Sequence, residues 1–172
     1  MITGGPGTGK TSCIEALKAR GYTCFDEVSR AVILKAREQG IEQLFLTEPL
    51  RFSEMLLEGR KAQHNEALEH SGSLLFLDRG LPDVLAYMDY KAEAYPDSFT
   101  EACIAHPYTQ VFVLAPWEAI YQSDNERYET FEQAEAIHQH LLDAYTRFGY
   151  QLHDVPFGSV EARIDFILNA IH

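Results

Sequence analysis

The first residues of the chain contain a pattern that surrounds phosphate groups in many proteins. They read Gly4-Gly5-Pro6-Gly7-Thr8-Gly9-Lys10-Thr11, which fits the spacing G-x-x-x-x-G-K-[ST]. Because glycine has no Cβ, the backbone can wrap closely around a phosphate chain and point its N–H groups at the anion. Lys10 supplies a positive charge for the β- and γ-phosphates of a nucleotide, and the Thr11 hydroxyl can bind Mg²⁺. The spacing therefore predicts a nucleotide-binding loop at residues 4–11, rather than a glycine-rich turn that happens to precede a helix.

A second candidate lies at the end of the apolar segment 74–77, Leu-Leu-Phe-Leu. Asp78 follows directly, so its carboxylate is expected at the tip of a buried strand, where phosphate-loop proteins hold Mg²⁺, usually through water. We therefore predict Thr11 and Asp78 as the metal-binding residues; the alternative is that Asp78 only ends the strand. The next residue is Arg79, where motor ATPases of this class typically carry a glutamate that polarises water. A cation at this position favours a kinase over a motor, because it can neutralise a transferred phosphoryl group.

A third group of charged residues follows the strand expected at 22–25. Asp26 and Glu27 stand at its tip, across the predicted cleft from the γ-phosphate, and either could act as a general base or orient an acceptor hydroxyl. We favour Glu27, with Arg30 one turn into the next helix as a cation that binds the substrate. The alternative, a carboxylate that complements the dipole of that helix, is equally consistent with the sequence.

A polar segment at about 117–131 is predicted to form a lid over the triphosphate. Small-molecule kinases carry a mobile lid after the corresponding strand, which excludes water and brings in an arginine. Arg127 is the only Lys or Arg between Lys91 and Arg147, so a lid cation in this interval must be Arg127. The alternative is a solvated helix face on which Arg127 is an ordinary surface charge. The loop 156–159, after the last expected strand, is predicted to touch the nucleobase.

Composition limits the classes of partner. The chain has 172 residues, enough for one domain with a sizeable core, and a net charge of −12. This charge argues against nucleic acid as a partner, because nucleic acid requires a concentrated basic surface. The 3 cysteines follow no zinc or disulfide spacing and are expected to be free thiols in a reducing cytoplasm. No segment is apolar enough to span a membrane, and the sequence leaves self-association into a homo-oligomer open.

Strands are expected to alternate with helices along the whole chain. Strands are predicted at 1–3, 22–25, 73–78, 108–114 and 150–155, and helices at 12–20, 28–39, 50–69, 82–90, 117–148 (broken near 124 and 130) and 159–171. This alternation predicts a single α/β domain over residues 1–172, a three-layer sandwich whose parallel five-stranded sheet has helices on both faces and ligands at the carboxyl ends of its strands. Only Met1, Ile2 and Thr3 precede the loop, so either the first strand is unusually short or this sequence starts downstream of the natural start.

These motifs together resemble the NadR-like AAA-domain family of small phosphate-loop ATPases and kinases. The resemblance covers essentially the whole chain and is carried by residues 1–11, Glu27-x-x-Arg30, Asp78-Arg79-Gly80-x-Pro82-Asp83-x-x-Ala86-Tyr87, Pro116-Trp117 with Tyr121-x-x-Asp124-x-x-Arg127, and Gly149-Tyr150 with Val155-Pro156-x-Gly158-Ser159-Val160. The family is similar to the nicotinamide riboside kinase domain and, more distantly, to deoxynucleoside and thymidylate kinases. In these relatives an acid–arginine pair after the third strand handles metal and phosphate, and a carboxylate after the second strand acts as the base. The resemblance implies these roles for Asp78, Arg79 and Glu27.

The residues and the resemblance together predict an enzyme that binds ATP and Mg²⁺ and transfers the γ-phosphoryl group to the hydroxyl of a small acceptor, such as a nucleoside or riboside. The predicted catalytic residues are Lys10, Glu27, Asp78, Arg79 and Arg127, and the predicted substrate contacts are Glu27, Arg30 and Arg79. The alternative is a slow ATPase or nucleotide-dependent switch that acts on a protein partner. A kinase requires an acceptor pocket near Glu27 and Arg79, whereas a switch requires an exposed apolar surface that changes with the nucleotide.

Overall fold

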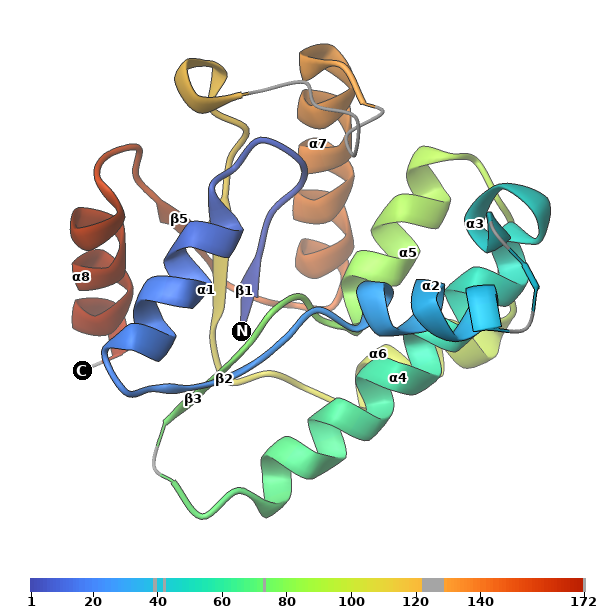
Figure 1. Cartoon of the computed structure of the whole chain (residues 1–172), viewed down its shortest axis with the longest axis horizontal. Coiled ribbons are helices and arrows are strands. Elements are labelled where there is room, and N and C mark those ends of the chain that lie inside the picture. The colour runs from blue at the N-terminus through green and yellow to red at the C-terminus, as the bar shows by residue number, and fades with distance from the viewer. Residues whose placement is uncertain (39, 42, 73, 122–128, 172) are drawn as a thin grey trace.

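The computed structural model of the chain describes residues 1–38, 40–41, 43–72, 74–121 and 129–171 (Figure 1). Within these residues the elements occur in the order β1 (Ile2–Thr3), α1 (Lys10–Ala19), β2 (Thr23–Phe25), α2 (Val28–Glu38), α3 (Leu44–Thr47), α4 (Pro49–Glu69), β3 (Leu75–Leu77), α5 (Leu81–Tyr90), α6 (Asp97–Ala105), β4 (Val111–Leu114), the 3₁₀ helix η1 (Glu118–Ile120), α7 (Phe131–Arg147), β5 (Leu152–Val155) and α8 (Val160–Ile171). Strands and helices alternate as predicted, and the fold class is α/β.

The strands of the described residues pair in parallel, but they form two sheets. The first has the order β1-β4-β5, and the second pairs β2 with β3. One bridge between Ile2 and Asp78 joins them, together with a hydrogen bond of 2.9 Å from the Arg79 N–H to the Ile2 carbonyl oxygen. The parallel arrangement is therefore confirmed, whereas the predicted continuous five-stranded sheet is not observed. Directly after the bridge the backbone of Arg79 takes φ 70°, a left-handed conformation outside the range of a β-strand.

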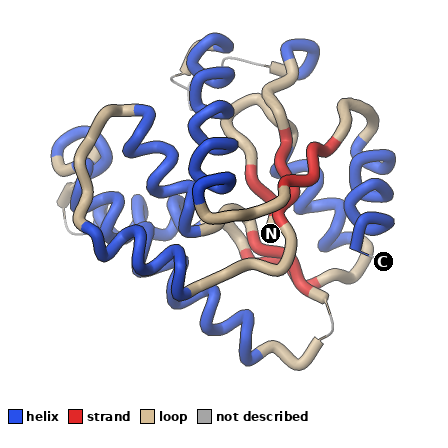
Figure 2. The backbone as a smooth tube through the Cα atoms, turned by 180° about the vertical axis from the view of Figure 1, so that it is seen from behind, coloured by secondary structure: helices blue, strands red, loops and turns tan. Residues whose placement is uncertain are grey.

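Helices cover both faces of the strands (Figures 1 and 2). Successive side chains of a strand point to opposite faces. Ile2 and Phe112 accordingly pack with buried residues of α1 and α8, whereas Val111 and Val113 pack with buried residues of α5 and α7. The molecule therefore has the predicted three layers.

A second group of helices packs together beside the strands. Val32 of α2, Leu57 of α4, Leu85 of α5 and Phe99 of α6 belong to one buried cluster. The sequence patterns above predict neither α3 nor α6. These helices have 4 and 9 residues, and hydrophobic periodicity needs a window of about 11 residues or more to indicate a helix.

The helix expected at 117–148 is shorter in the structure. Strand β4 is followed by η1, and α7 begins only at Phe131. Thr130 is its N-cap: the Gln133 N–H donates to the Thr130 hydroxyl at 3.3 Å, and the Thr130 N–H donates to the Gln133 side-chain oxygen at 2.8 Å. The predicted break near Thr130 is confirmed. Residues 122–128, which include Arg127 and much of the predicted lid, lie outside the described residues.

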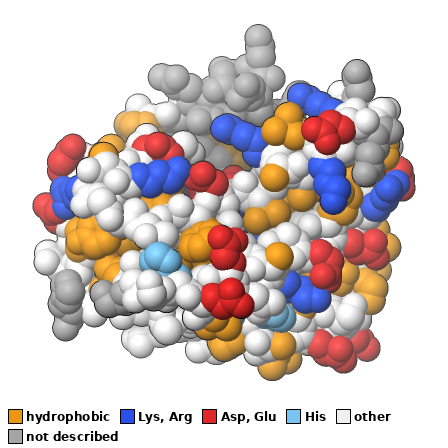
Figure 3. Space-filling model, turned by 60° about the horizontal axis from the view of Figure 1, so that its bottom comes forward, with side chains coloured by type: hydrophobic (Ala, Val, Ile, Leu, Met, Phe, Trp, Pro, Cys, Tyr) orange, Lys and Arg blue, Asp and Glu red, His pale blue; other side chains and the backbone are white. Residues whose placement is uncertain are grey.

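The surface mixes charges of both signs. On the face drawn in Figure 3, Lys and Arg side chains are scattered among Asp and Glu side chains. None of the described helices combines the length and the apolar character that a membrane span requires. The cysteines Cys13, Cys24 and Cys103 are free thiols, as predicted.

Candidate functional site

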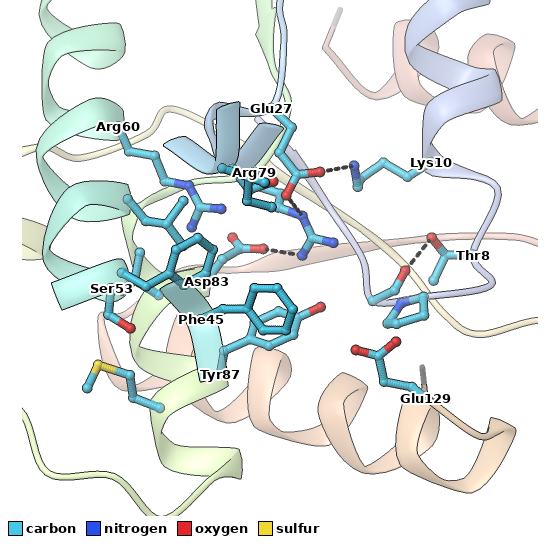
Figure 4. A pocket seen from close by; sticks show the side chains of 18 of the residues that line it. Thr8, Lys10, Glu27, Phe45, Ser53, Arg60, Arg79, Asp83, Tyr87 and Glu129 are labelled. Carbon is cyan, nitrogen blue, oxygen red and sulfur yellow. Dashed lines mark hydrogen bonds and ion pairs between the residues drawn. The ribbon is translucent and has the colours of Figure 1, made fainter. Parts of the chain in front are cut away.

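A cavity of about 530 Å³ lies between the phosphate loop and the helices α2 to α5 (Figure 4). Residues 5–12 line one end. The charged side chains of Glu27 and Arg79 lie between this end and the helices. The apolar part of the wall is formed by Ile33, Phe45, Pro49, Phe52, Leu56, Val84 and Met88. A cavity of this size, in which polar groups converge beside an apolar wall, is typical of small-molecule sites.

The glycines of the phosphate loop adopt conformations that other residues avoid. The angle φ is 71° at Gly7 and 75° at Gly9, directly before α1. A Cβ at Gly7 would lie 2.1 Å from the ring of Tyr121, so only glycine fits there. Arg163 of α8 holds the loop by donating from Nη1 to the Thr8 carbonyl oxygen at 2.8 Å. The loop therefore presents the N-terminus of α1 to the cavity, which favours an anion.

Lys10 lies between two carboxylates. Its ammonium group donates a hydrogen bond to Asp78 Oδ1 and lies 3.9 Å from Glu27 Oε2. Burial and the nearby Arg79 charge lower the pKa of Lys10, while the two carboxylates oppose this shift. Burial raises the pKa of Asp78, and the charge of Lys10 opposes it. Each member of the buried Lys10–Asp78 pair thus compensates the charge of the other, and loss of one leaves the other unpaired.

Glu27 is held as a carboxylate in the cavity. Its Oε1 lies 2.9 Å from Nε of Arg79, and Nη1 of Arg79 also donates to Asp83 at 3.2 Å. Burial by itself would raise the pKa of Glu27, but the positive charges of Arg79, Lys10 and Arg60 outweigh it and set the pKa at about 2. Glu27 is consequently ionised at neutral pH and can accept a hydrogen bond from a hydroxyl group.

The structure separates the two carboxylates that follow β2. Asp26 is exposed and pairs with Lys18 at 2.5 Å, whereas Glu27 lines the cavity. Arg30, the predicted substrate cation, is also exposed and does not line the cavity. The structure thus brings the predicted residues Lys10, Glu27, Asp78 and Arg79 together with the phosphate loop, and it leaves Arg30 outside this group.

Arg60 of α4 is a buried cation on the helical side of the cavity, and the sequence motifs predicted no site residue in this helix. Arg60 is 4% exposed and donates from Nη1 to the Gly80 carbonyl oxygen at 2.9 Å, but its buried Nε has no hydrogen-bond partner. The sequence does contain a signal for it. The spacing of Ser53, Leu57, Arg60 and His64 places all four on one face of α4, and all four are buried. An arginine on the buried face of a helix requires a partner.

The residues predicted to bind Mg²⁺ fit that ion. The Thr11 hydroxyl lies in the first turn of α1, and the Asp78 carboxylate lies just beyond β3. Both supply oxygen, which Mg²⁺ prefers. Over the residues described, no group of three or more His, Cys, Asp or Glu could enclose a metal. Mg²⁺ is commonly held by one or two protein oxygens, with water and nucleotide phosphates completing its shell, so this small donor set suits it.

A second cavity, of about 470 Å³, shares Gly7, Gly9 and Ser12 with the first. Its other lining residues are Trp117, Ile120, Gly158, Ser159, Val160 and Arg163. Phe157 stacks on Trp117 with ring centroids 5.2 Å apart. Part of the loop 156–159, predicted to touch a nucleobase, therefore lies beside the phosphate loop.

Known proteins share this sequence pattern and this fold. Residues 1–163 match the model of a family described as an AAA domain. Deoxyadenosine kinase from M. mycoides with the products dCMP and a flexible dCDP bound gives a TM-score of 0.71 at 17% identity, over 99% of this chain and 96% of that chain. The structure of the same kinase with bound dATP gives a TM-score of 0.62 at 17% identity, over 99% of this chain and 97% of that chain. The structure with bound dCTP gives a TM-score of 0.66 at 16% identity, over 99% of this chain and 96% of that chain. None of the curated proteins matches the chain. At this identity the structural likeness concerns the fold.

Proposed function

Because the chain belongs to this AAA-domain family of phosphate-loop proteins, we propose that it is a Mg²⁺-dependent phosphotransferase that moves the γ-phosphoryl group of ATP to a hydroxyl group of a nucleoside- or riboside-like acceptor. The fold supports a kinase, since the three solved structures of similar fold named above are structures of deoxyadenosine kinase. The finer points of this proposal, namely ATP, Mg²⁺ and the acceptor class, rest on the chemistry of the cavity.

The observation that carries the proposal is the position of Glu27. Its carboxylate lies 3.9 Å from the ammonium of Lys10, the residue of the loop that would contact the terminal phosphates. A hydroxyl group bound to Glu27 would therefore be close to the γ-phosphate. A phosphate group as acceptor would meet repulsion from the ionised carboxylate, so the site favours a hydroxyl.

The proposed reaction is a direct displacement. The acceptor oxygen bonds to the γ-phosphorus, the bond from that phosphorus to the β–γ bridging oxygen breaks, and ADP leaves. Glu27 orients the hydroxyl and receives its proton as the new bond forms; with a pKa of about 2 it is a weak base beforehand. Such a late proton transfer is compatible with phosphoryl transfer, whose transition state is usually loose. Arg79 would neutralise charge on the transferred group, and Mg²⁺ held by Thr11 and Asp78 would neutralise charge on the phosphates.

The helical side of the cavity supports an acceptor that carries a ring. Phe45 and Phe52 pack edge to face with centroids 6.1 Å apart, and both line the cavity with Tyr87. Aromatic side chains of this kind can stack on a planar base. Arg60 lines the cavity and has donor groups beyond the one that bonds to Gly80, so it would donate to a carbonyl or hydroxyl oxygen of the same molecule. The second cavity would hold the nucleobase of ATP near Trp117.

The proposal is tested by measuring ADP release with Mg·ATP against a panel of nucleosides, ribosides and other small alcohols, with products identified by mass spectrometry. We expect slow release without an acceptor and an increase of orders of magnitude with the right one. If no acceptor stimulates release, and nucleotide instead alters binding of a protein partner, the chain is a switch and the proposal is wrong.

Asp78→Asn is expected to abolish Mg²⁺-dependent turnover while the fold persists. The amide is nearly the same size as the carboxylate but carries no charge for the metal shell. Turnover is measured across a Mg²⁺ titration, and the fold by circular dichroism. Turnover and Mg²⁺ dependence at the wild-type level would show that Asp78 only ends β3.

Arg60→Met is expected to raise the KM for the acceptor by at least about tenfold and the KM for ATP by less than about twofold. Methionine preserves much of the apolar stem but cannot donate hydrogen bonds, and such a bond from a charged group contributes about 1.5–3 kcal/mol. Lys61→Met is the matched control, because Lys61 is its neighbour on α4 and pairs with Glu58 at the surface. An unchanged acceptor KM would exclude contact between Arg60 and the acceptor.

A further inference from the structure

Asp83 is a carboxylate buried completely within the protein. It belongs to the first turn of α5 and its side chain is 0% exposed. Transfer of an ionised carboxylate from water to the interior is unfavourable unless it is paired and hydrogen-bonded. Its partners therefore indicate what it does.

Four donors surround this carboxylate, two at each oxygen. Oδ2 accepts from the Gly80 N–H at 3.0 Å and from the Tyr145 hydroxyl. Oδ1 accepts from the Thr3 hydroxyl at 2.6 Å and from Nη1 of Arg79 at 3.2 Å. Three of these donors, from β1, α7 and the start of α5, fix the carboxylate, and the fourth belongs to a side chain of the cavity.

Arg79 also has an unusual backbone conformation. It adopts φ 70°, a conformation that residues with a Cβ rarely take, while its N–H donates to the Ile2 carbonyl oxygen at 2.9 Å. Its guanidinium lies between Asp83 and Glu27, with Nε 2.9 Å from Glu27 Oε1, and 5.5 Å from the ring centroid of Tyr87 (Figure 4). Arg79 is therefore held by a buried carboxylate on one side and faces the reacting carboxylate on the other.

We propose that Asp83 is a positioning residue, which uses the hydroxyl groups of Thr3 and Tyr145 to fix Arg79 and, through Arg79, the orientation of Glu27 toward the phosphate loop. The expected effect on turnover rests on the proposed function, whereas the fixing of the Arg79 side chain by Asp83 does not depend on it. The simpler alternative is that Asp83 only caps α5 through the Gly80 N–H. In that case the conformation of the Arg79 side chain would not depend on Asp83.

The first test observes Arg79 directly. The side-chain Nε–H of Arg79 is followed by ¹⁵N NMR and assigned by its loss in Arg79→Lys. We expect a dispersed, slowly exchanging signal in the wild-type protein. In Asp83→Asn it should move toward the position of free arginine and exchange at least about tenfold faster, because Nη1 loses its charged partner and the guanidinium is no longer held with Nε against Glu27. An unchanged signal in folded Asp83→Asn would overturn the proposal, whether or not the protein is a kinase.

A second variant covers the case in which Asp83→Asn does not fold. Tyr145→Phe keeps the carboxylate and the cap of α5 but removes one donor to Oδ2, so the Arg79 signal should move in the same direction by a smaller amount. Tyr150→Phe is the control, because the Tyr150 ring packs on Tyr145 while its hydroxyl accepts from the Tyr108 N–H. A signal that does not respond to Tyr145→Phe when Asp83→Asn is unfolded contradicts the proposal.

The second test asks whether Asp83 acts through Glu27. Asp83→Asn should lower acceptor-stimulated kcat by about 10–100-fold with little change in the KM for ATP, since misplacement of a catalytic group by about 1 Å can cost about 100-fold. In a Glu27→Gln background the same substitution should cost less than about threefold, because the group that it positions is already absent. Losses that multiply would show a general structural role and overturn the inference. Absence of stimulation in the wild-type protein would refute the proposed function, and the NMR result would then decide this inference by itself.

Discussion

Lys10→Ala is expected to weaken ATP binding by about 10–100-fold while adenosine binding changes by less than about twofold. The Lys10 ammonium would bond to phosphate oxygens, and hydrogen bonds that involve charged groups contribute about 1.5–3 kcal/mol. In the proposed binding mode the nucleobase would occupy the second cavity, which Lys10 does not line, so the loss of this side chain should not affect it. Isothermal titration calorimetry with Mg·ATP and with adenosine measures both effects.

Two further variants make this result interpretable. Lys18→Ala removes a lysine from the same helix that pairs at the surface with Glu15 and Asp26, and should leave ATP binding unchanged. Lys10→Met retains an apolar stem and checks that the unpaired, buried Asp78 does not unfold the protein. Full-strength ATP binding by folded Lys10→Ala would contradict the assignment of the phosphate loop.

Glu27→Gln is expected to lower acceptor-stimulated turnover by about 10²–10⁴-fold, the usual range for loss of a general base. Basal ATP hydrolysis should hardly change, because that reaction does not use the acceptor hydroxyl. The pKa of Glu27, about 2, keeps the carboxylate ionised throughout the neutral range, so the size of the loss should be the same at pH 6 and at pH 8. Turnover is measured as ADP release at saturating acceptor.

The neighbouring carboxylate supplies the control. Asp26→Asn changes an exposed residue that pairs with Lys18 outside the cavity, and should leave stimulated turnover within about twofold of wild type. Equal losses in Asp26→Asn and Glu27→Gln would mean that the effect is not specific to the cavity. Stimulated turnover that survives Glu27→Gln would remove Glu27 from the mechanism.

The sequence by itself determined the features that depend on local spacing. The phosphate loop at 4–11 is a contiguous pattern, and it predicts that its glycines and Lys10 face one ligand because they are neighbours in the chain. Short apolar segments alternate along the chain with segments of helical periodicity, and this alternation likewise predicted the α/β class and helices on both faces of the sheet. The positions of Glu27 and Arg79 at the ends of parallel strands predicted that they would meet, because these ends lie at one edge of a sheet.

Tertiary structure alone decided which of several similar residues reach the cavity. Arg30 and Arg60 are both arginines on helices, and only packing of α4 against its neighbours buries Arg60 at the cavity while Arg30 stays exposed. The same holds for Asp83, whose donors Thr3 and Tyr145 are 80 and 62 residues away. Contacts between residues so distant in the chain leave no local pattern, because they arise from how whole helices and strands pack. The division of the strands into two sheets has the same origin, since Ile2 and Asp78 form a single bridge between them and the backbone turns directly afterwards at Arg79.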